Sequence, residues 1–195
     1  DPEVLEAMLP YLKENYGNAS SIHDLGQKSY VAIDIARKQI ADFLHCQPNQ
    51  IIFCGSATEA NNLAIQGFLK NKTNPHIITT KIEHPAVLNT IAQFKDVTYI
   101  NASKEGIINP LDVRKAIKEN TVLISILYAN NEIGTIQPIE EIADIVAREN
   151  KKRKQKIYFH TDAVQAINYL DCNVETLNID FLTLSAHKIY GPKGI

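Results

Sequence analysis

Short apolar segments alternate with longer amphipathic ones along most of the chain. Six runs are rich in β-branched and aromatic residues and are apolar on both faces, which is typical of buried parallel strands. They cover residues 51–53, 76–80, 97–100, 122–127, 157–159 and 181–184. Helical patterns precede, separate or follow them, at residues 29–44, 57–69, 85–94, 111–118 and 139–148.

This alternation predicts an α/β fold: an α/β/α sandwich with a mainly parallel sheet and helices on both faces. The chain has 195 residues, which is enough for one substantial domain, and it shows no internal repeat and no low-complexity linker. We therefore expect residues 1–195 to form one domain.

The composition is that of an ordinary globular protein, with 45% hydrophobic residues, 22% charged residues and a net charge of −2. This balance gives no reason to expect a nucleic acid or a membrane as partner. A basic run at residues 148–156 could form a nuclear-localisation or nucleic-acid patch, but we favour a solvated loop between a helix and a strand, because the rest of the chain is not basic. No signal sequence is visible at the start, so we expect a cytoplasmic protein.

The three cysteines, Cys46, Cys54 and Cys172, are widely separated and form no C-x-x-C pair. Cys54 follows an apolar run, so we expect a buried, unreactive thiol there. The other two are expected to be structural or incidental.

Polar residues follow each predicted strand, where ligands of open α/β sheets bind. After residues 51–53, a turn of small residues opens a helix whose free N–H groups at Ala57 and Thr58 suit a phosphate, although a simple helix cap would look the same. His84 precedes a proline at a helix start and is a candidate acid/base or ring-stacking group. Neither G-x-x-x-x-G-K-[ST] nor G-x-G-x-x-G is present, so nucleotides are not indicated.

The later strand ends carry amides, a carboxylate and a lysine. Asn131 lies in a polar cluster after residues 122–127, and Asp162 with Gln165 follows residues 157–159. His160 and Asp162 share one face of an extended segment and could in principle bind a metal, but no further ligands have suitable spacing. The last strand leads into Ser185-Ala186-His187-Lys188.

One cofactor would use all of these groups. Pyridoxal phosphate needs an anion site, a carboxylate facing its ring nitrogen, amides for its phenolic oxygen and a lysine for its aldehyde. Asp162 is the candidate for the ring nitrogen and Lys188 for the aldehyde. We expect Lys188 to be desolvated, which would favour its free amine.

Five ordered stretches, GSATEANNLAI, KIEHPAVLNT, LYANNEIGTIQPI, HTDAVQAI and SAHKIYGPKGI, resemble the cysteine desulfurases of the NifS/IscS group. These are class V aminotransferase-family, fold-type I pyridoxal-phosphate enzymes. The resemblance implies that Lys188 holds the cofactor covalently, that His84 stacks on its ring and handles protons, and that Asp162 pairs with the pyridinium nitrogen. It assigns Gln165 and Asn131 to the ring oxygen or the substrate. The phosphate would be held by Ala57, Thr58, Ser185 and His187.

The family reaction converts L-cysteine to L-alanine and passes the sulfur to an enzyme cysteine, for iron–sulfur clusters or thiolated tRNA. The resemblance implies a homodimer and a sulfur-acceptor or iron–sulfur scaffold protein as partner. Alternatives are a class V aminotransferase, a selenocysteine lyase, or a non-catalytic cofactor-binding fragment.

The sequence departs from the family pattern in several places. The family's opening strand, its sulfur-accepting cysteine and its substrate-binding arginine are not in view. We therefore expect residues 1–195 to be a partial large domain, truncated before the small domain and inactive alone. Gly55-Ser56 also stands where a glycine directly before Ala-Thr is expected, and the basic run is an insertion.

Overall fold

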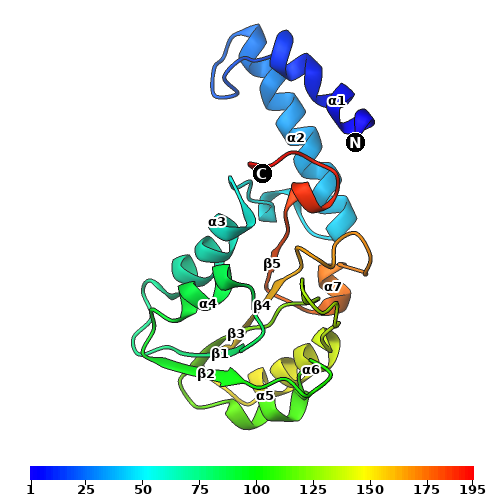
Figure 1. Ribbon diagram of the computed structural model, residues 1–195. Coiled ribbons are helices and arrows are strands. Elements are labelled where there is room, and N and C mark those ends of the chain that lie inside the picture. The colour runs from blue at the N-terminus through cyan, green and yellow to red at the C-terminus, as the bar shows by residue number, and fades with distance from the viewer.

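The computed structural model describes all residues from 1 to 195 and contains one five-stranded parallel sheet (Figure 1). The strand order is β2-β1-β3-β4-β5, and every neighbouring pair is parallel. The strands are β1 (His76–Thr80), β2 (Asp96–Ile100), β3 (Thr121–Ser125), β4 (Tyr158–Asp162) and β5 (Phe181–Thr183). The predicted α/β fold with a parallel sheet is confirmed.

Helices cover both faces of the sheet. One face carries α3 (Ala57–Asn62), its π-helical continuation η2 (Leu63–Gly67) and α4 (Pro85–Ile91). The opposite face carries α5 (Pro110–Ala116), α6 (Ile139–Asn150) and α7 (Val174–Leu177), which bury the larger apolar core against β1, β3 and β4. The central strands β1 and β3 are buried along their whole length, as expected for strands whose consecutive apolar residues face both sides of a parallel sheet.

Two helices project beyond the sheet as an arm, formed by α1 (Pro2–Lys13) and α2 (Asp24–Leu44) (Figure 1). The helix α1, which the sequence pattern did not predict, buries none of its residues. Asp1 caps its start by accepting a hydrogen bond from the Glu3 backbone N–H, and Pro2 occupies the first turn, so local signals suffice to begin this helix. None of the helices combines the length and apolarity needed to cross a membrane.

The strand predicted at residues 51–53 is wrong. This segment is extended but has no strand partner; it follows the 3₁₀ turn η1 (Pro48–Gln50), and the Ile51 N–H bonds back to the Pro48 carbonyl. Its side chains face an apolar cavity shared with Leu182 and Leu184 beside β5, the edge strand. An extended, apolar segment becomes a strand only when another backbone offers it hydrogen bonds, and none does so here.

The remaining predicted elements are present with shifted ends. The helix predicted at residues 29–44 begins five residues earlier, where His23 accepts a hydrogen bond from the Gly26 N–H. The basic run leaves α6 and forms the loop to β4, in which the Arg153 guanidinium donates to the carbonyls of Lys118, Glu119 and Thr121. Arg153 therefore fastens this loop to the turn before β3.

Candidate cofactor site

All nine residues predicted to bind a cofactor line one cavity of about 350 Å³ at the carboxyl ends of the strands. Segments after β1, β3, β4 and β5 reach it together with the start of α3, as expected for an open parallel sheet. The nine are Ala57, Thr58, His84, Asn131, Asp162, Gln165, Ser185, His187 and Lys188.

The start of α3 offers free hydrogen-bond donors to the cavity. Ser56 caps the helix by accepting from the Glu59 N–H at 3.1 Å, and Glu59 Oε2 accepts from the Gly55 N–H at 2.6 Å. The backbone N–H groups of Ala57 and Thr58 have no partner in the chain. Two free N–H groups at a helix start suit an anion such as a phosphate.

Asp162 forms the floor of the cavity at the end of β4 and is 8% exposed. Its Oδ2 accepts a hydrogen bond of 2.8 Å from Asn61 Nδ2, and its Oδ1 accepts one of 3.1 Å from the Val164 N–H. Both oxygens are therefore fixed, and the carboxylate presents its charge in one orientation.

Asn61 is a cavity residue that the sequence interpretation did not single out. It lies on α3 four residues after Ala57, so helical periodicity places it on the face that also carries Ala57. The four-residue spacing from Ala57 is the sequence signal that could have predicted Asn61 as a cavity residue.

His84 caps α4, and its Nδ1 accepts a hydrogen bond of 3.1 Å from the Ala86 N–H. In the neutral ring the proton therefore resides on Nε2, which makes no bond to the protein and is available to the cavity.

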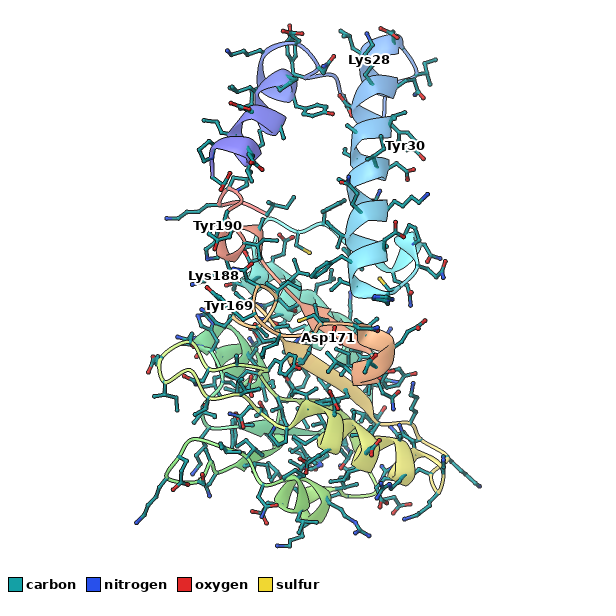
Figure 2. The ribbon with its side chains drawn as sticks, turned by 90° about the vertical axis from the view of Figure 1, so that its right-hand side faces the viewer. Lys28, Tyr30, Tyr169, Asp171, Lys188 and Tyr190 are labelled. Atoms are coloured by element: carbon teal, nitrogen blue, oxygen red, sulfur yellow. The ribbon has the colours of Figure 1, made fainter.

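Lys188 ends the 3₁₀ turn η3 (Ala186–Lys188) and lines the cavity at the end of the sheet nearest the arm (Figure 2). The expected desolvation of this lysine is not found, because its side chain is exposed in residues 1–195. The short segment that follows Lys188, including Lys193 and Ile195, lines the same cavity. Ser185 Oγ lies 2.8 Å from His187 Nδ1, so the two predicted phosphate partners are joined to each other.

His160 belongs to the core and not to the cavity. Its ring nitrogens contact Ser125 Oγ at 2.8 Å and Thr183 Oγ1 at 3.2 Å, and burial lowers its pKa to about 4. With both nitrogens engaged by hydroxyls, no lone pair is directed to a metal alongside Asp162. The chain contains no group of three or more histidine, cysteine, aspartate or glutamate side chains placed to hold a metal ion.

Fold and site together describe an α/β protein in which free N–H groups at a helix start, a fixed carboxylate and a lysine surround one cavity at the carboxyl ends of a parallel sheet. The chain belongs to the class-V aminotransferase family, whose model matches residues 1–195. Pyridoxal phosphate is the cofactor of this family, and the free N–H groups of α3, the carboxylate of Asp162 and the amine of Lys188 fit its phosphate, ring nitrogen and aldehyde.

Named relatives agree with this assignment. The chain is 52% identical over 198 residues to cysteine desulfurase IscS of Methanosarcina thermophila, covering 98% of this chain and 48% of the relative. It is 47% identical over 201 residues to cysteine desulfurase IscS of Clostridium botulinum, covering 100% and 49%. The chain thus spans about half the length of these relatives.

Solved structures match the whole chain. One described as SspA in complex with cysteine has a TM-score of 0.92 and 43% sequence identity, covering 100% of this chain and 56% of that one. A NifS-like protein has a TM-score of 0.92 and 38% identity, covering 100% and 54%. The predicted resemblance to the NifS/IscS group is confirmed.

Proposed function

We propose that the full-length protein is a pyridoxal-phosphate-dependent cysteine desulfurase and that residues 1–195 supply the cofactor-binding part of its large domain. The observation that carries this proposal is the convergence of Lys188, Asp162, His84 and the free N–H groups of α3 on one cavity. It is supported by relatives that are named cysteine desulfurases and are 52% and 47% identical to this chain. The reaction would convert L-cysteine to L-alanine and release sulfur for iron–sulfur clusters or tRNA thiolation.

The side chains of the cavity would divide the work by their chemistry. When bound, pyridoxal phosphate supplies an electron sink that makes the carbon–sulfur bond of cysteine labile. Asp162, fixed by Asn61 and the Val164 N–H, would hold a proton on the ring nitrogen. Lys188 would anchor the aldehyde through its amine, and His84 would stack on the ring and move a proton at Nε2.

The outer parts of the cofactor would be held by groups at the rim. The N–H groups of Ala57 and Thr58, with Ser185 and His187, would bind the phosphate. Asn131 and Gln165 would reach the ring oxygen or the substrate.

The thiol that accepts sulfur is proposed to lie outside residues 1–195. None of the three cysteines lines the cavity. Burial raises the pKa of each thiol, and that of Cys172 reaches about 11, so each favours the protonated, weakly nucleophilic form.

Substrate and partners follow the same proposal. A neighbour solved in complex with cysteine supports L-cysteine as substrate. A homodimer, and a sulfur-acceptor or iron–sulfur scaffold protein, remain predictions, as does the cytoplasm. Relatives described as mitochondrial or mitosomal make an organelle the alternative location.

Cofactor binding is tested by absorbance spectroscopy of the full-length protein with pyridoxal phosphate. We expect a visible band of bound cofactor that Lys188→Ala abolishes. Lys193→Ala is the matched control because Lys193 lines the same cavity, and it should keep the band. Loss of the band in Lys193→Ala but not in Lys188→Ala would reverse the assignment, and a folded protein without any band would refute the cofactor.

The reaction itself is tested by supplying L-cysteine and a thiol reductant and measuring sulfide and alanine. Equal amounts of both products, absent from Lys188→Ala, are expected of a desulfurase. Alanine formation only when pyruvate is added, with 3-mercaptopyruvate and no sulfide as the other product, would indicate an aminotransferase, and turnover only with selenocysteine would indicate a selenocysteine lyase. Substantial turnover by residues 1–195 alone would contradict the proposed division of the protein.

A further inference from the structure

Glu83 is a buried acidic residue beside the cavity that the cofactor roles above do not include. It is 5% exposed and directly precedes His84. Its Oε1 accepts two hydrogen bonds, one of 2.8 Å from Thr80 Oγ1 at the end of β1 and one of 2.9 Å from the Leu127 N–H beyond β3. The carboxyl group therefore joins the ends of two neighbouring strands at the point where β1 leaves the sheet.

A second hydrogen bond joins the same two segments. Asn130 Nδ2 donates to the Ile82 carbonyl at 3.0 Å. His84 lines the cavity from the first segment, and Leu127 and Asn131 line it from the second. Glu83 and Asn130 thus fasten together two walls of the proposed cofactor site.

The surroundings of Glu83 favour its neutral form. Its Oε2 is buried and has no hydrogen-bond partner, and no cation forms an ion pair with it. Burial raises the pKa of Glu83 to about 8, and the negative charge of Asp162 acts in the same direction. The charged group that faces Glu83 is Asp162 of β4. The neighbouring elements β1, β3 and α4 contain no Asp, Glu, Lys or Arg. His160 of β4 is neutral because burial lowers its pKa to about 4.

We propose that Glu83 is a positioning residue which, as a neutral carboxylic acid, holds the segment that carries His84 against the end of β3. Its role as a support for cofactor binding rests on the proposed function, whereas its protonation state does not. Neutrality leaves Asp162 as the single negative charge beneath the cavity, so the charge offered to the cofactor ring is not divided between two acids.

The protonation state predicts a pH dependence of stability. The pKa of Glu83 is about 8 in the folded chain and has the ordinary value of 4.5 when unfolded. Between these values the folded state holds a proton that the unfolded state has released. The free energy of unfolding therefore falls as pH rises through this window and levels off above it.

The test compares the melting temperature of full-length wild-type protein and Glu83→Gln at intervals from about pH 5 to pH 8, without cofactor. The wild type should lose melting temperature relative to Glu83→Gln as pH rises. Glu119→Gln, which removes an exposed acid, should parallel the wild type. Parallel curves for wild type and Glu83→Gln would show that Glu83 is ionised and overturn the proposal.

Pyridoxal phosphate affinity at pH 7 tests the positioning role. Glutamine keeps the accepting oxygen, so Glu83→Gln should bind within about twofold of wild type, whereas Glu83→Ala leaves Thr80 and Leu127 without an acceptor and should bind about tenfold or more weakly. Unchanged affinity in a folded Glu83→Ala, or a tenfold loss in Glu83→Gln, would refute the role. Absence of cofactor binding by the wild type would refute the proposed function but leave the melting comparison intact.

Discussion

The orientation of Asp162 depends on one buried amide. Asn61 is 1% exposed, its Nδ2 donates to Asp162 Oδ2 at 2.8 Å, and its own Oδ1 is buried without a partner. A buried carbonyl oxygen without a partner is costly, and the bond that Asn61 donates to Asp162 offsets part of that cost. Stability and cofactor binding should therefore respond together when the amide is removed.

Asn61→Leu tests this coupling with a side chain of similar size. The Asp162 carboxylate loses a donor, which costs about 1–3 kcal/mol when the acceptor is charged, partly offset by removal of the unpaired Oδ1. We expect a lower urea midpoint together with weaker binding of pyridoxal phosphate. Asn89→Leu, at an exposed position of α4, is the control and should change neither. An unchanged affinity in Asn61→Leu would show that Asp162 keeps its orientation without Asn61.

At the scale of elements, the hydrophobic pattern predicted a strand correctly wherever residues 1–195 also contain the neighbouring strand that pairs with it. The β1 bounds match the predicted run at both ends because hydrophobic side chains on both faces require burial in a sheet. Residues 51–53 are also apolar but have no neighbouring backbone to pair with. Strand pairing needs two segments, so the pattern of one segment alone does not predict it.

The site was predictable for a related reason. Residues that follow parallel strands meet at one edge, so the positions of His84, Asp162 and Lys188 followed from strand order. The role of Glu83 could not be predicted in this way, because a charged residue after a strand normally faces water. Glu83 is buried in the folded chain, where β3 lies beside β1.

The turn after Lys188 depends on close approach of its backbone to η3. A methyl group at Gly191 would lie 2.8 Å from Ala186 Cβ and 2.9 Å from the Ala186 carbonyl oxygen, where the Gly191 N–H now donates a bond of 2.8 Å. Gly191→Ala must therefore displace this turn, which places Lys193 and Ile195 in the wall of the cavity.

We expect Gly191→Ala to weaken pyridoxal phosphate binding and to cost about 1–3 kcal/mol of stability, as overpacking commonly does. Gly67→Ala is the control, because its methyl group would meet Leu63 Cδ1 at an ordinary 3.5 Å. Titration of the cofactor absorbance and a urea melt measure the two effects. Wild-type values for Gly191→Ala would mean that the turn adapts without affecting the site.

For the whole molecule, the arm of α1 and α2 is the feature that residues 1–195 leave unexplained. Its apolar side chains are exposed along both helices; they include Leu5, Leu12, Tyr30, Val31, Ile35 and Phe43. Tyr30 projects from the side of α2, with no other element of the chain near it (Figure 2). This many exposed apolar side chains on one arm indicate that another surface covers them. A second copy of the protein and the part of the proposed full-length protein outside residues 1–195 are the two candidates.

The oligomeric state of the full-length protein distinguishes these two candidates, because we predict a homodimer. Val31 and Ile35 are 51% and 54% exposed and lie one turn apart on α2, so Val31→Asp with Ile35→Asp should disturb little within residues 1–195. If a second copy covers this face, burying two carboxylates there is prohibitive, and the full-length double variant should be monomeric by light scattering where wild type is dimeric. Leu111→Asp, at a 56% exposed position of α5, is the control and should stay dimeric. A folded double variant that stays dimeric would place this face of the arm outside the dimer interface. A double variant that stays dimeric but melts at a lower temperature than wild type would instead assign the face to a contact within its own chain.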